Sequence, residues 1–257
     1  MKVPASAQEE STEHRHNVSS IGPPSENSHI LPIRLMRSML TRGVRRRNRI
    51  VFIKPSYYIV DNLKQDSVVV DVGTGWNADF SIGIIHRYGL QCHAVDPTRK
   101  HYERLIELQK KYPTLHVHRL ALSSKDGIES FHESRTNVSG SLYEDHINAL
   151  NDECIVYEVE TVSLPTLLRR IGVEGISLLK MDIEGAEYGI LRPENSRILC
   201  EIPQITMEFH HNIIKRFSRD DTQRKVDFMN ELGFDSFSVD GLNYLFYLRR
   251  YGQDDTE

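Results

Sequence analysis

Apolar and polar positions alternate along most of the chain in a pattern that predicts strands followed by helices. The run SVVVDVG, residues 67–73, is short, rich in β-branched residues and closed by glycine, which is typical of a buried parallel strand. Strand signals recur from residue 56 onward, each followed by a helical pattern, and they predict a doubly wound α/β sheet. We expect the other strands at 90–96, 115–123, 154–162, 176–182 and 204–210, and the helices at 79–88, 98–112, 164–172 and 220–233.

Two regions depart from this alternation. Residues 234–250 form two alternating runs around a turn, which predicts a β-hairpin in place of another strand and helix. The polar stretch from residue 124 to about residue 152 predicts a loop with a small hairpin, where substrate selectivity can lie. The expected architecture is a mostly parallel sheet that closes with a C-terminal antiparallel hairpin.

The N-terminal part differs from the rest in composition. Residues 1–29 are polar without periodicity and predict a disordered tail. Apolar residues then recur at helical spacing over 30–44, and five arginines lie within 42–49, so we expect an amphipathic helix beside a solvated basic face. Contact of 30–49 with an anionic substrate or a membrane surface is the alternative. We divide the chain into the tail 1–29, the Arg-rich segment 30–55, a main domain 56–250 and a polar tail 251–257.

Composition limits the classes of function. A net charge of −4 over 257 residues provides no general attraction for nucleic acid. The three cysteines, Cys92, Cys154 and Cys200, are widely spaced and form neither a disulfide framework nor a zinc pattern, which favours a reducing cytoplasm. The N-terminus has no apolar segment, and no apolar run approaches the roughly 20 residues that span a bilayer. We therefore expect a cytoplasmic protein without a transmembrane segment.

A glycine turn follows the first buried strand. Gly73, Gly75 and Ala78 have G-x-G-x-x-A spacing between a strand and a helix, where glycines permit a tight turn and the helix N-terminus offers free N–H groups. Thr74 lies between the two glycines. Asp96 follows Gly75 at the tip of the next strand, where a carboxylate can accept hydrogen bonds from ribose hydroxyls. Together these residues predict a site for a cofactor that contains a nucleoside.

Two cofactors satisfy this pattern, a nicotinamide dinucleotide and S-adenosylmethionine. Asp71 precedes the first glycine by two residues, and a carboxylate there would repel a pyrophosphate but attract an ammonium and a sulfonium. The alternative for Asp71 is a structural role in capping the N–H groups of the turn. The balance favours S-adenosylmethionine.

Several segments resemble the FkbM-like family of S-adenosylmethionine-dependent methyltransferases over roughly residues 60–250. They are VVVDVGTGWNADFS, HAVDPT, LALSSKDG, LLKMDIEGAEYGIL and ITMEFH. The resemblance implies a class I methyltransferase (Rossmann-like) fold and, most often, O-methylation of sugar hydroxyls or of hydroxyls on secondary metabolites. It assigns Asp71, Gly73 and Gly75 to the cofactor motif and Asp96 to the ribose. Many relatives have a third glycine where this chain has Asn77, which we expect to cap the following helix.

The segment LLKMDIEGAE carries the most distinctive chemistry. Alternation along the strand places Lys180, Asp182 and Glu184 on one side. We predict that Asp182 contacts the cofactor and acts as base or hydrogen-bond partner of the acceptor, and that Lys180 and Glu184 contact substrate. Glu187 falls in the first turn of a short helix, where the dipole favours a negative charge. Glu187 therefore has two candidate roles, contact with the substrate and stabilisation of the helix.

Glu208 and His210 share one side of the next strand and complete the predicted catalytic group. A histidine near neutral pKa is suited to accept a proton. With Asp182 they could instead hold a divalent metal, but a site without metal is favoured. Ser139 and Ser141 of the polar loop are candidate substrate contacts, and Trp76 either covers the cofactor or packs beneath the helix.

These residues together predict an S-adenosylmethionine-dependent O-methyltransferase whose acceptor is a small molecule or a glycan. The expected target is a sugar hydroxyl of a glycan, a glycolipid or a glycosylated metabolite. A nicotinamide-dependent oxidoreductase and a non-catalytic cofactor-binding protein of the same fold are the alternatives. The acceptor itself and the oligomeric state are left open by the sequence.

Overall fold

The computed structural model describes residues 43–45, 48–146 and 153–249. The predicted tails 1–29 and 251–257 and nearly all of the predicted helix 30–44 lie outside this part of the chain. Two of the five arginines of the run at 42–49, Arg45 and Arg49, lie within it. In the described part of the chain, no helix combines the length and the apolar character needed to cross a bilayer.

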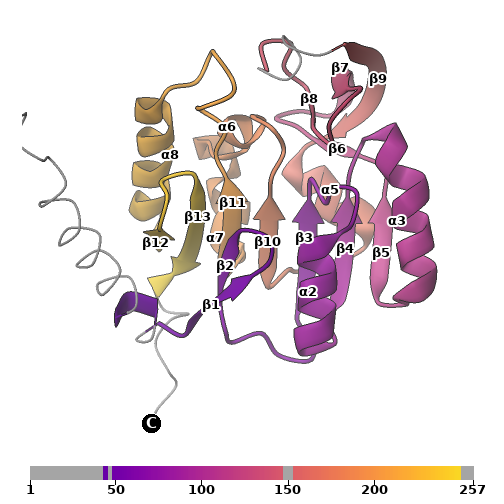
Figure 1. The fold of residues 1–257 in the computed structure, drawn as a ribbon. Coiled ribbons are helices and arrows are strands. Elements are labelled where there is room, and N and C mark those ends of the chain that lie inside the picture. Colours follow the sequence, from indigo (N-terminus) through magenta and orange to yellow (C-terminus); the bar gives the residue numbers. More distant parts are fainter. Residues whose placement is uncertain (1–42, 46–47, 147–152, 250–257) are drawn as a thin grey trace, which may run out of the picture. The chain divides into compact units, whose positions relative to one another are not determined.

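A seven-stranded sheet occupies the centre of the described chain (Figure 1). In spatial order its strands are β12 (Phe234–Ser238), β13 (Asn243–Leu248), β11 (Gln204–Glu208), β10 (Leu178–Met181), β3 (Val68–Val72), β4 (Gln91–Val95) and β5 (Leu115–His118). The strands from β11 to β5 are parallel, whereas β13 runs antiparallel to both of its neighbours. The predicted doubly wound sheet with its closing hairpin is confirmed.

Helices pack on both faces of this sheet (Figure 1). Because successive strand residues point to opposite faces, Val70 and Val72 pack in one apolar cluster with Leu167, and Val69 packs in a second cluster with Phe80. Burial on both faces explains why the strands read as continuous apolar runs. The described helices are α2 (Asp79–Tyr88), α3 (Arg99–Lys111), α5 (Leu164–Ile171), α6 (Glu187–Ile190), α7 (Ser196–Glu201), α8 (Arg219–Glu231) and the 3₁₀ helix η2 (Pro193–Asn195).

A separate four-stranded sheet corrects two of the predicted strands. The run at 115–123 divides into β5 and a second strand, and the strand at 154–162 does not enter the central sheet. The second sheet has the order β6 (Ala121–Leu122), β9 (Cys154–Val162), β7 (Gly127–Ser134) and β8 (Gly140–Ser141). In β9 the exposed Glu158 and Glu160 alternate with the buried Tyr157, Val159 and Thr161, which is the pattern of a strand buried on one face only.

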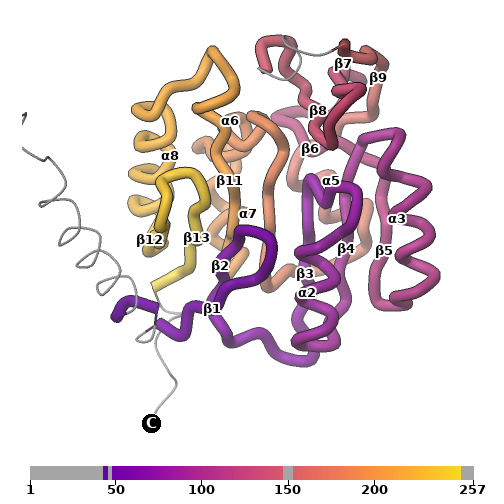
Figure 2. The backbone as a smooth tube through the Cα atoms, viewed as in Figure 1, coloured from indigo at the N-terminus to yellow at the C-terminus, as the bar shows by residue number. Residues whose placement is uncertain are grey.

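A hairpin that the sequence did not predict lies before the central sheet. Strands β1 (Ile50–Ile53) and β2 (Tyr57–Val60) pair antiparallel and span the predicted boundary between the segments 30–55 and 56–250. The N–H of Val60 donates to Oε1 of Gln204 over 2.8 Å, which ties β2 to β11. Figure 2 traces the chain from this hairpin, in indigo, into β3. At the start of β2, the hydroxyl of Tyr57 reaches Asp182, the residue after β10, so the hairpin brings a segment far away in sequence to the carboxyl end of β10.

Candidate functional site

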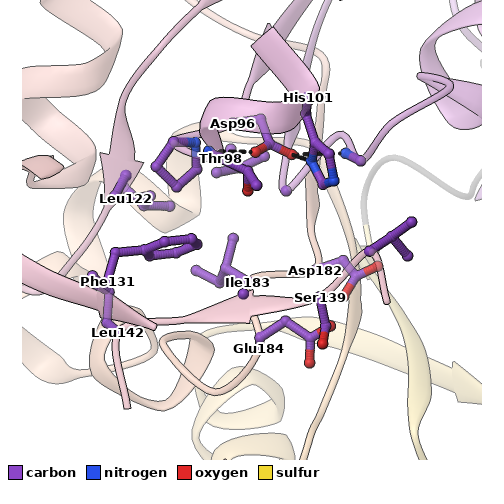
Figure 3. Close-up of a pocket in the computed structure, with 17 residues that line it drawn as sticks. Asp96, Thr98, His101, Leu122, Phe131, Ser139, Leu142, Asp182, Ile183 and Glu184 are labelled. Carbon is purple, nitrogen blue, oxygen red and sulfur yellow. Dashed lines mark hydrogen bonds and ion pairs between the residues drawn. The ribbon is translucent and has the colours of Figure 1, made fainter. Parts of the chain in front are cut away.

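Two adjoining pockets lie at the carboxyl ends of β3, β4 and β10. The first is lined by residues of these strand ends and of the second sheet (Figure 3). The second is lined by the glycine turn, Tyr57, Trp76, Phe80 and Lys180. Asp182 and the glycine turn border both. The predicted site is thus a single region in which the strand ends meet. The principal residues that line the first pocket are Gly73, Gly75, Asp96, Thr98, His101, Leu122, Phe131, Val138, Ser139, Leu142, Asp182, Ile183 and Glu184.

The glycine turn after β3 lies directly against the residue that follows β10. Gly73 has a φ of 72°, and a Cβ atom at this position would lie 1.6 Å from the carbonyl oxygen of Asp182. Gly75 also has a φ of 72°, but a Cβ there would meet nothing within 4 Å. The prediction that Asn77 caps the next helix is wrong: Ala78 is the N-cap of α2, with a left-handed φ of 52°. Thr74 Oγ1 donates to the carbonyl of Asp71 over 2.8 Å, which stabilises the turn itself.

Asp96 lies inside the first pocket and is almost fully buried. Its Oδ2 accepts from the N–H of Gly75 over 2.8 Å, and its Oδ1 accepts from the N–H of Thr98 over 2.9 Å. Nδ1 of His101 lies 3.2 Å from Oδ2. Burial would raise the pKa of Asp96, but His101 first and then Thr98 lower it below its ordinary value. Asp96 is therefore a carboxylate held in place by the glycine turn and by α3.

Sequence reasoning missed His101, since no motif marks the fifth residue after the strand-end acid. It is 2% exposed and lines the first pocket. Trp76 lies edge to face against its ring, with centroids 6.1 Å apart, and also borders the second pocket. Figure 3 shows the dashed contact between His101 and Asp96 at one side of the pocket, opposite Phe131, Leu142 and Glu184.

Asp71 is fully buried, and neither described pocket includes it in its lining. Its Oδ2 accepts from Ser81 Oγ over 2.7 Å, and its Oδ1 lies 3.1 Å from Nζ of Lys180. Burial would lower the pKa of Lys180, but Asp71 and Asp182 raise it above its ordinary value. The Asp71 charge is therefore paired inside the protein. Lys180 also lines the second pocket, so its ammonium lies between that pocket and the Asp71 carboxylate.

Asp182 follows the last residue of β10 and receives three side-chain contacts, two of them from distant segments. Tyr57 of the N-terminal hairpin donates its hydroxyl to Oδ2 over 2.5 Å. Nε2 of His210 lies 3.3 Å from Oδ1, and Nζ of Lys180 lies 3.8 Å from Oδ2. Burial would raise the pKa of Asp182, but Lys180, His210 and Tyr57 hold it well below its ordinary value. The carboxylate is therefore ionised and fixed in orientation.

Glu187 has a different role from that of Asp182. It is fully buried, and its Oε1 accepts from the N–H of Ile183 and from Nδ1 of His210, both over 2.9 Å. Its Oε2 accepts from the N–H of Gly185 over 2.9 Å. Glu187 thus fixes the turn after β10 and orients the imidazole, so that Nε2 of His210 faces Asp182. Burial would lower the pKa of His210, but Glu187, Asp182 and Glu184 raise it well above its ordinary value.

Glu184 belongs to the turn, because β10 ends at Met181 and the strand alternation that placed it beside Lys180 does not continue. It has a φ of 50°, and its Oε2 lies 2.7 Å from Nε2 of His146 and 3.6 Å from Nε2 of His210. The carboxylate still lines the first pocket. His146 is a second residue of the site that no sequence pattern indicated.

Glu208, at the end of β11, is half-buried beside Asp182 and His210. Burial, followed by the charge of Asp182, raises its pKa from 4.5 to about 7. One ligand atom from each of these three residues lies within 4.8 Å of the others, a spacing that could hold a metal ion. The three predicted catalytic residues are therefore brought together.

The two candidate serines differ in their position relative to the first pocket. Ser141 is buried, and its hydroxyl donates to the carbonyl of Glu184 over 2.6 Å, which positions that turn. Ser139 lines the first pocket, with its hydroxyl 2.6 Å from Oδ1 of Asn137. Lys100 donates to the carbonyls of Ser134 and Asn137, both over 2.5 Å, and so holds this loop over the pocket. Ser139 is the one of the pair placed to contact a ligand.

One comparison with known proteins identifies a family for this chain. A family model described as Methyltransferase FkbM domain matches residues 77–236. Among curated proteins, none gives a significant match to the chain.

Solved methyltransferases are among the structures that are similar to this chain, at low sequence identity. An rRNA methylase from Streptococcus thermophilus is 10% identical with a TM-score of 0.42, and the alignment covers 85% of this chain and 97% of that one. A precorrin-6y C5,15-methyltransferase from Geobacter metallireducens is 11% identical with a TM-score of 0.42, covering 73% and 82%. Aeropyrum pernix fibrillarin with bound S-adenosyl-L-methionine is 10% identical with a TM-score of 0.37, covering 72% and 66%.

Proposed function

Because the chain belongs to the methyltransferase FkbM family, we propose that it transfers a methyl group from S-adenosylmethionine to a sugar hydroxyl of a glycan, a glycolipid or a glycosylated metabolite. The observation that carries the proposal is the ionised Asp182, oriented by Tyr57 and His210 at the border of both pockets. Transfer from a sulfonium is an in-line displacement, so the protein has to align the acceptor and remove its proton.

The charges of the first pocket favour a cationic cofactor. Its lining includes three carboxylates, those of Asp96, Asp182 and Glu184, and among the lining residues described there is no lysine or arginine. The sulfonium and ammonium of S-adenosylmethionine are attracted to such a surface, whereas a pyrophosphate is repelled. This supports S-adenosylmethionine over a nicotinamide dinucleotide. Asp96 and the glycine turn suit the nucleoside portion.

The three catalytic candidates have different proton affinities. His210 carries a proton at neutral pH, because its pKa is held well above its ordinary value, and Asp182 holds its negative charge because its pKa is held well below. Glu208, with a pKa of about 7, is the best matched to accept a proton near neutral pH. We assign proton removal to Glu208. The oxygen of the acceptor then attacks the methyl carbon, S-adenosylhomocysteine leaves, and Glu208 releases the proton to water.

Asp182 and His210 have a positioning role in this scheme. The Asp182 carboxylate accepts a hydrogen bond from a sugar hydroxyl next to the one that attacks, which leaves the hydrogen of the attacking hydroxyl to Glu208, and His210 keeps Asp182 in orientation. A divalent cation on Asp182, Glu208 and His210 would be a second way to ionise the hydroxyl, since one ligand atom from each lies within 4.8 Å of the others. The two schemes differ in their response to a chelator.

The test measures methyl transfer from labelled S-adenosylmethionine to a panel of hydroxylated sugars and glycosides. Asp182→Asn should reduce product formation about 100-fold or more, since the acceptor loses its alignment. Asp66→Asn, at an exposed loop residue, is the matched control and should leave the rate unchanged. Unchanged product formation by Asp182→Asn would refute the assignment. Binding of S-adenosylhomocysteine without turnover on any acceptor would support a non-catalytic binding protein, and binding of NADH an oxidoreductase.

A further inference from the structure

The hydrogen bonds of Asp96 leave it short of acceptor positions for a ribose. An ionised carboxylate offers about four lone-pair positions. Three are filled by the N–H groups of Gly75 and Thr98 and by Nδ1 of His101. At most one remains for a ligand. A ribose with free 2′ and 3′ hydroxyls presents two donors, so one of them needs another acceptor.

His101 supplies an atom of the required kind. Since a carboxylate only accepts, the hydrogen shared with Asp96 belongs to Nδ1, and in the tautomer whose single ring hydrogen is on Nδ1 the atom Nε2 carries a lone pair. Nε2 is buried, and within the described chain it has no hydrogen-bond partner. The residue lines the first pocket beside Asp96. A buried polar atom without a partner is costly, so a ligand that supplies a donor there is stabilised.

We propose that His101 is a second ribose-binding residue, whose Nε2 accepts a hydrogen bond from one ribose hydroxyl of the cofactor while Asp96 accepts from the other. The proposal rests on the proposed function, because it takes the nucleoside of S-adenosylmethionine to lie against Asp96. It makes the cofactor pocket selective for an unmodified diol. A phosphate on either hydroxyl would remove a donor and place a negative charge beside the Asp96 carboxylate.

Two substitutions separate the two ring nitrogens. His101→Asn places an amide NH₂ near the position of Nδ1, so donation to Asp96 is kept while the acceptor at Nε2 is lost. His101→Gln reaches the position of Nε2 and restores an acceptor oxygen there. The matched control is His93→Asn, because His93 is a buried histidine of β4 that does not line the first pocket.

The experiment is calorimetric titration of each protein with S-adenosylhomocysteine and with its 2′-deoxy and 3′-deoxy analogues. In the natural protein each analogue should bind about tenfold more weakly, as one buried acceptor loses its donor. In His101→Asn, S-adenosylhomocysteine itself should bind about tenfold more weakly, and one analogue should show no further loss. His101→Gln should recover part of the difference, and His93→Asn should keep the ratios of the natural protein.

Affinity ratios within one protein cancel any general loss of folded molecules. The proposal is overturned if His101→Asn discriminates against both analogues as strongly as the natural protein does, or if His93→Asn alters the ratios equally. Failure of the natural protein to bind S-adenosylhomocysteine would overturn the proposed cofactor site and this inference with it. If S-adenosylhomocysteine binds tightly but the predicted affinity ratios are not found, only the ribose-binding role of His101 is refuted.

Discussion

Gly73 and Gly75 form a natural pair for testing how closely β3 and β10 must approach. Both have a φ of 72°, so an alanine at either position adopts the left-handed region at a cost of about 1–2 kcal/mol. They differ in their surroundings. A methyl group at Gly73 would lie 1.6 Å from the carbonyl oxygen of Asp182, whereas one at Gly75 would meet nothing within 4 Å.

The magnitude follows from the contacts that would have to move. Relieving the overlap at Gly73 separates the turn from residue 182 by more than 1 Å, since an ordinary contact begins at 3.4 Å. That movement breaks the bonds from Asp182 N–H to Val72 O and from Lys180 Nζ to Gly73 O, 3.0 and 2.6 Å long. With about 1 kcal/mol for each bond added to the backbone strain, Gly73→Ala should lower the free energy of unfolding by about 3–4 kcal/mol. Gly75→Ala should lower it by about 1–2 kcal/mol.

Urea unfolding of the two variants, followed by circular dichroism, measures this difference. Titration with S-adenosylhomocysteine adds a second comparison, because Gly75 lines both pockets and its new methyl group would occupy ligand space. Gly75→Ala should therefore remain folded and bind more weakly. Equal unfolding free energies for the two variants, within about 1 kcal/mol, would refute the argument from close approach.

Four further predictions concern three side chains. The methylation rate should rise with pH through about 7 as Glu208 ionises, with no response to chelator, whereas rescue by added Mn²⁺ after chelation would favour the metal scheme. The raised pKa of Glu208 stabilises the fold at low pH, and this contribution is lost as the pH rises from 4.5 to about 7. In urea unfolding at pH 8, Glu208→Gln should therefore raise the free energy of unfolding by about 1 kcal/mol, after allowance for partial exposure. Tyr57→Phe removes the donor to Asp182 and should slow turnover about tenfold or more with little change in cofactor affinity. Tyr58→Phe is the control, and an unchanged rate in Tyr57→Phe would contradict the role of Tyr57. Ser218→Ala breaks the capping box of α8 and should cost about 1 kcal/mol of stability without altering turnover, so a loss of activity in a fully folded variant would contradict it.

The central sheet was predictable because its signals are local. Continuous apolar runs mark strands buried on both faces, and glycines such as Gly89, which caps α2 with a φ of 71°, mark where helices end. The position of β9 was not predictable in this way, since its alternating pattern identifies a strand but not the sheet that it joins. The hairpin of β1 and β2 was missed because two four-residue strands give a weak signal.

The candidate site shows the same division. Gly73, Gly75, Asp96 and Asp182 follow from motif spacing on the strand ends, and the structure brings them to one region. The contacts of Tyr57, His101 and His146 join residues that no periodic pattern relates. Tyr57 is 125 positions from Asp182 in the chain, and only the folded topology makes them neighbours.

The position of the N-terminal hairpin limits how this protein can be recombined with its relatives. The family match begins at residue 77, after the hairpin, after β3 and after both glycines of the turn. A chimera spliced at that residue would exchange the strand end that carries Asp182 but keep the tyrosine and the turn of the host. Because Tyr57, Gly73 and Asp182 meet at one point, they have to be inherited together. The smallest interchangeable unit therefore begins no later than Ile50, the first residue of β1.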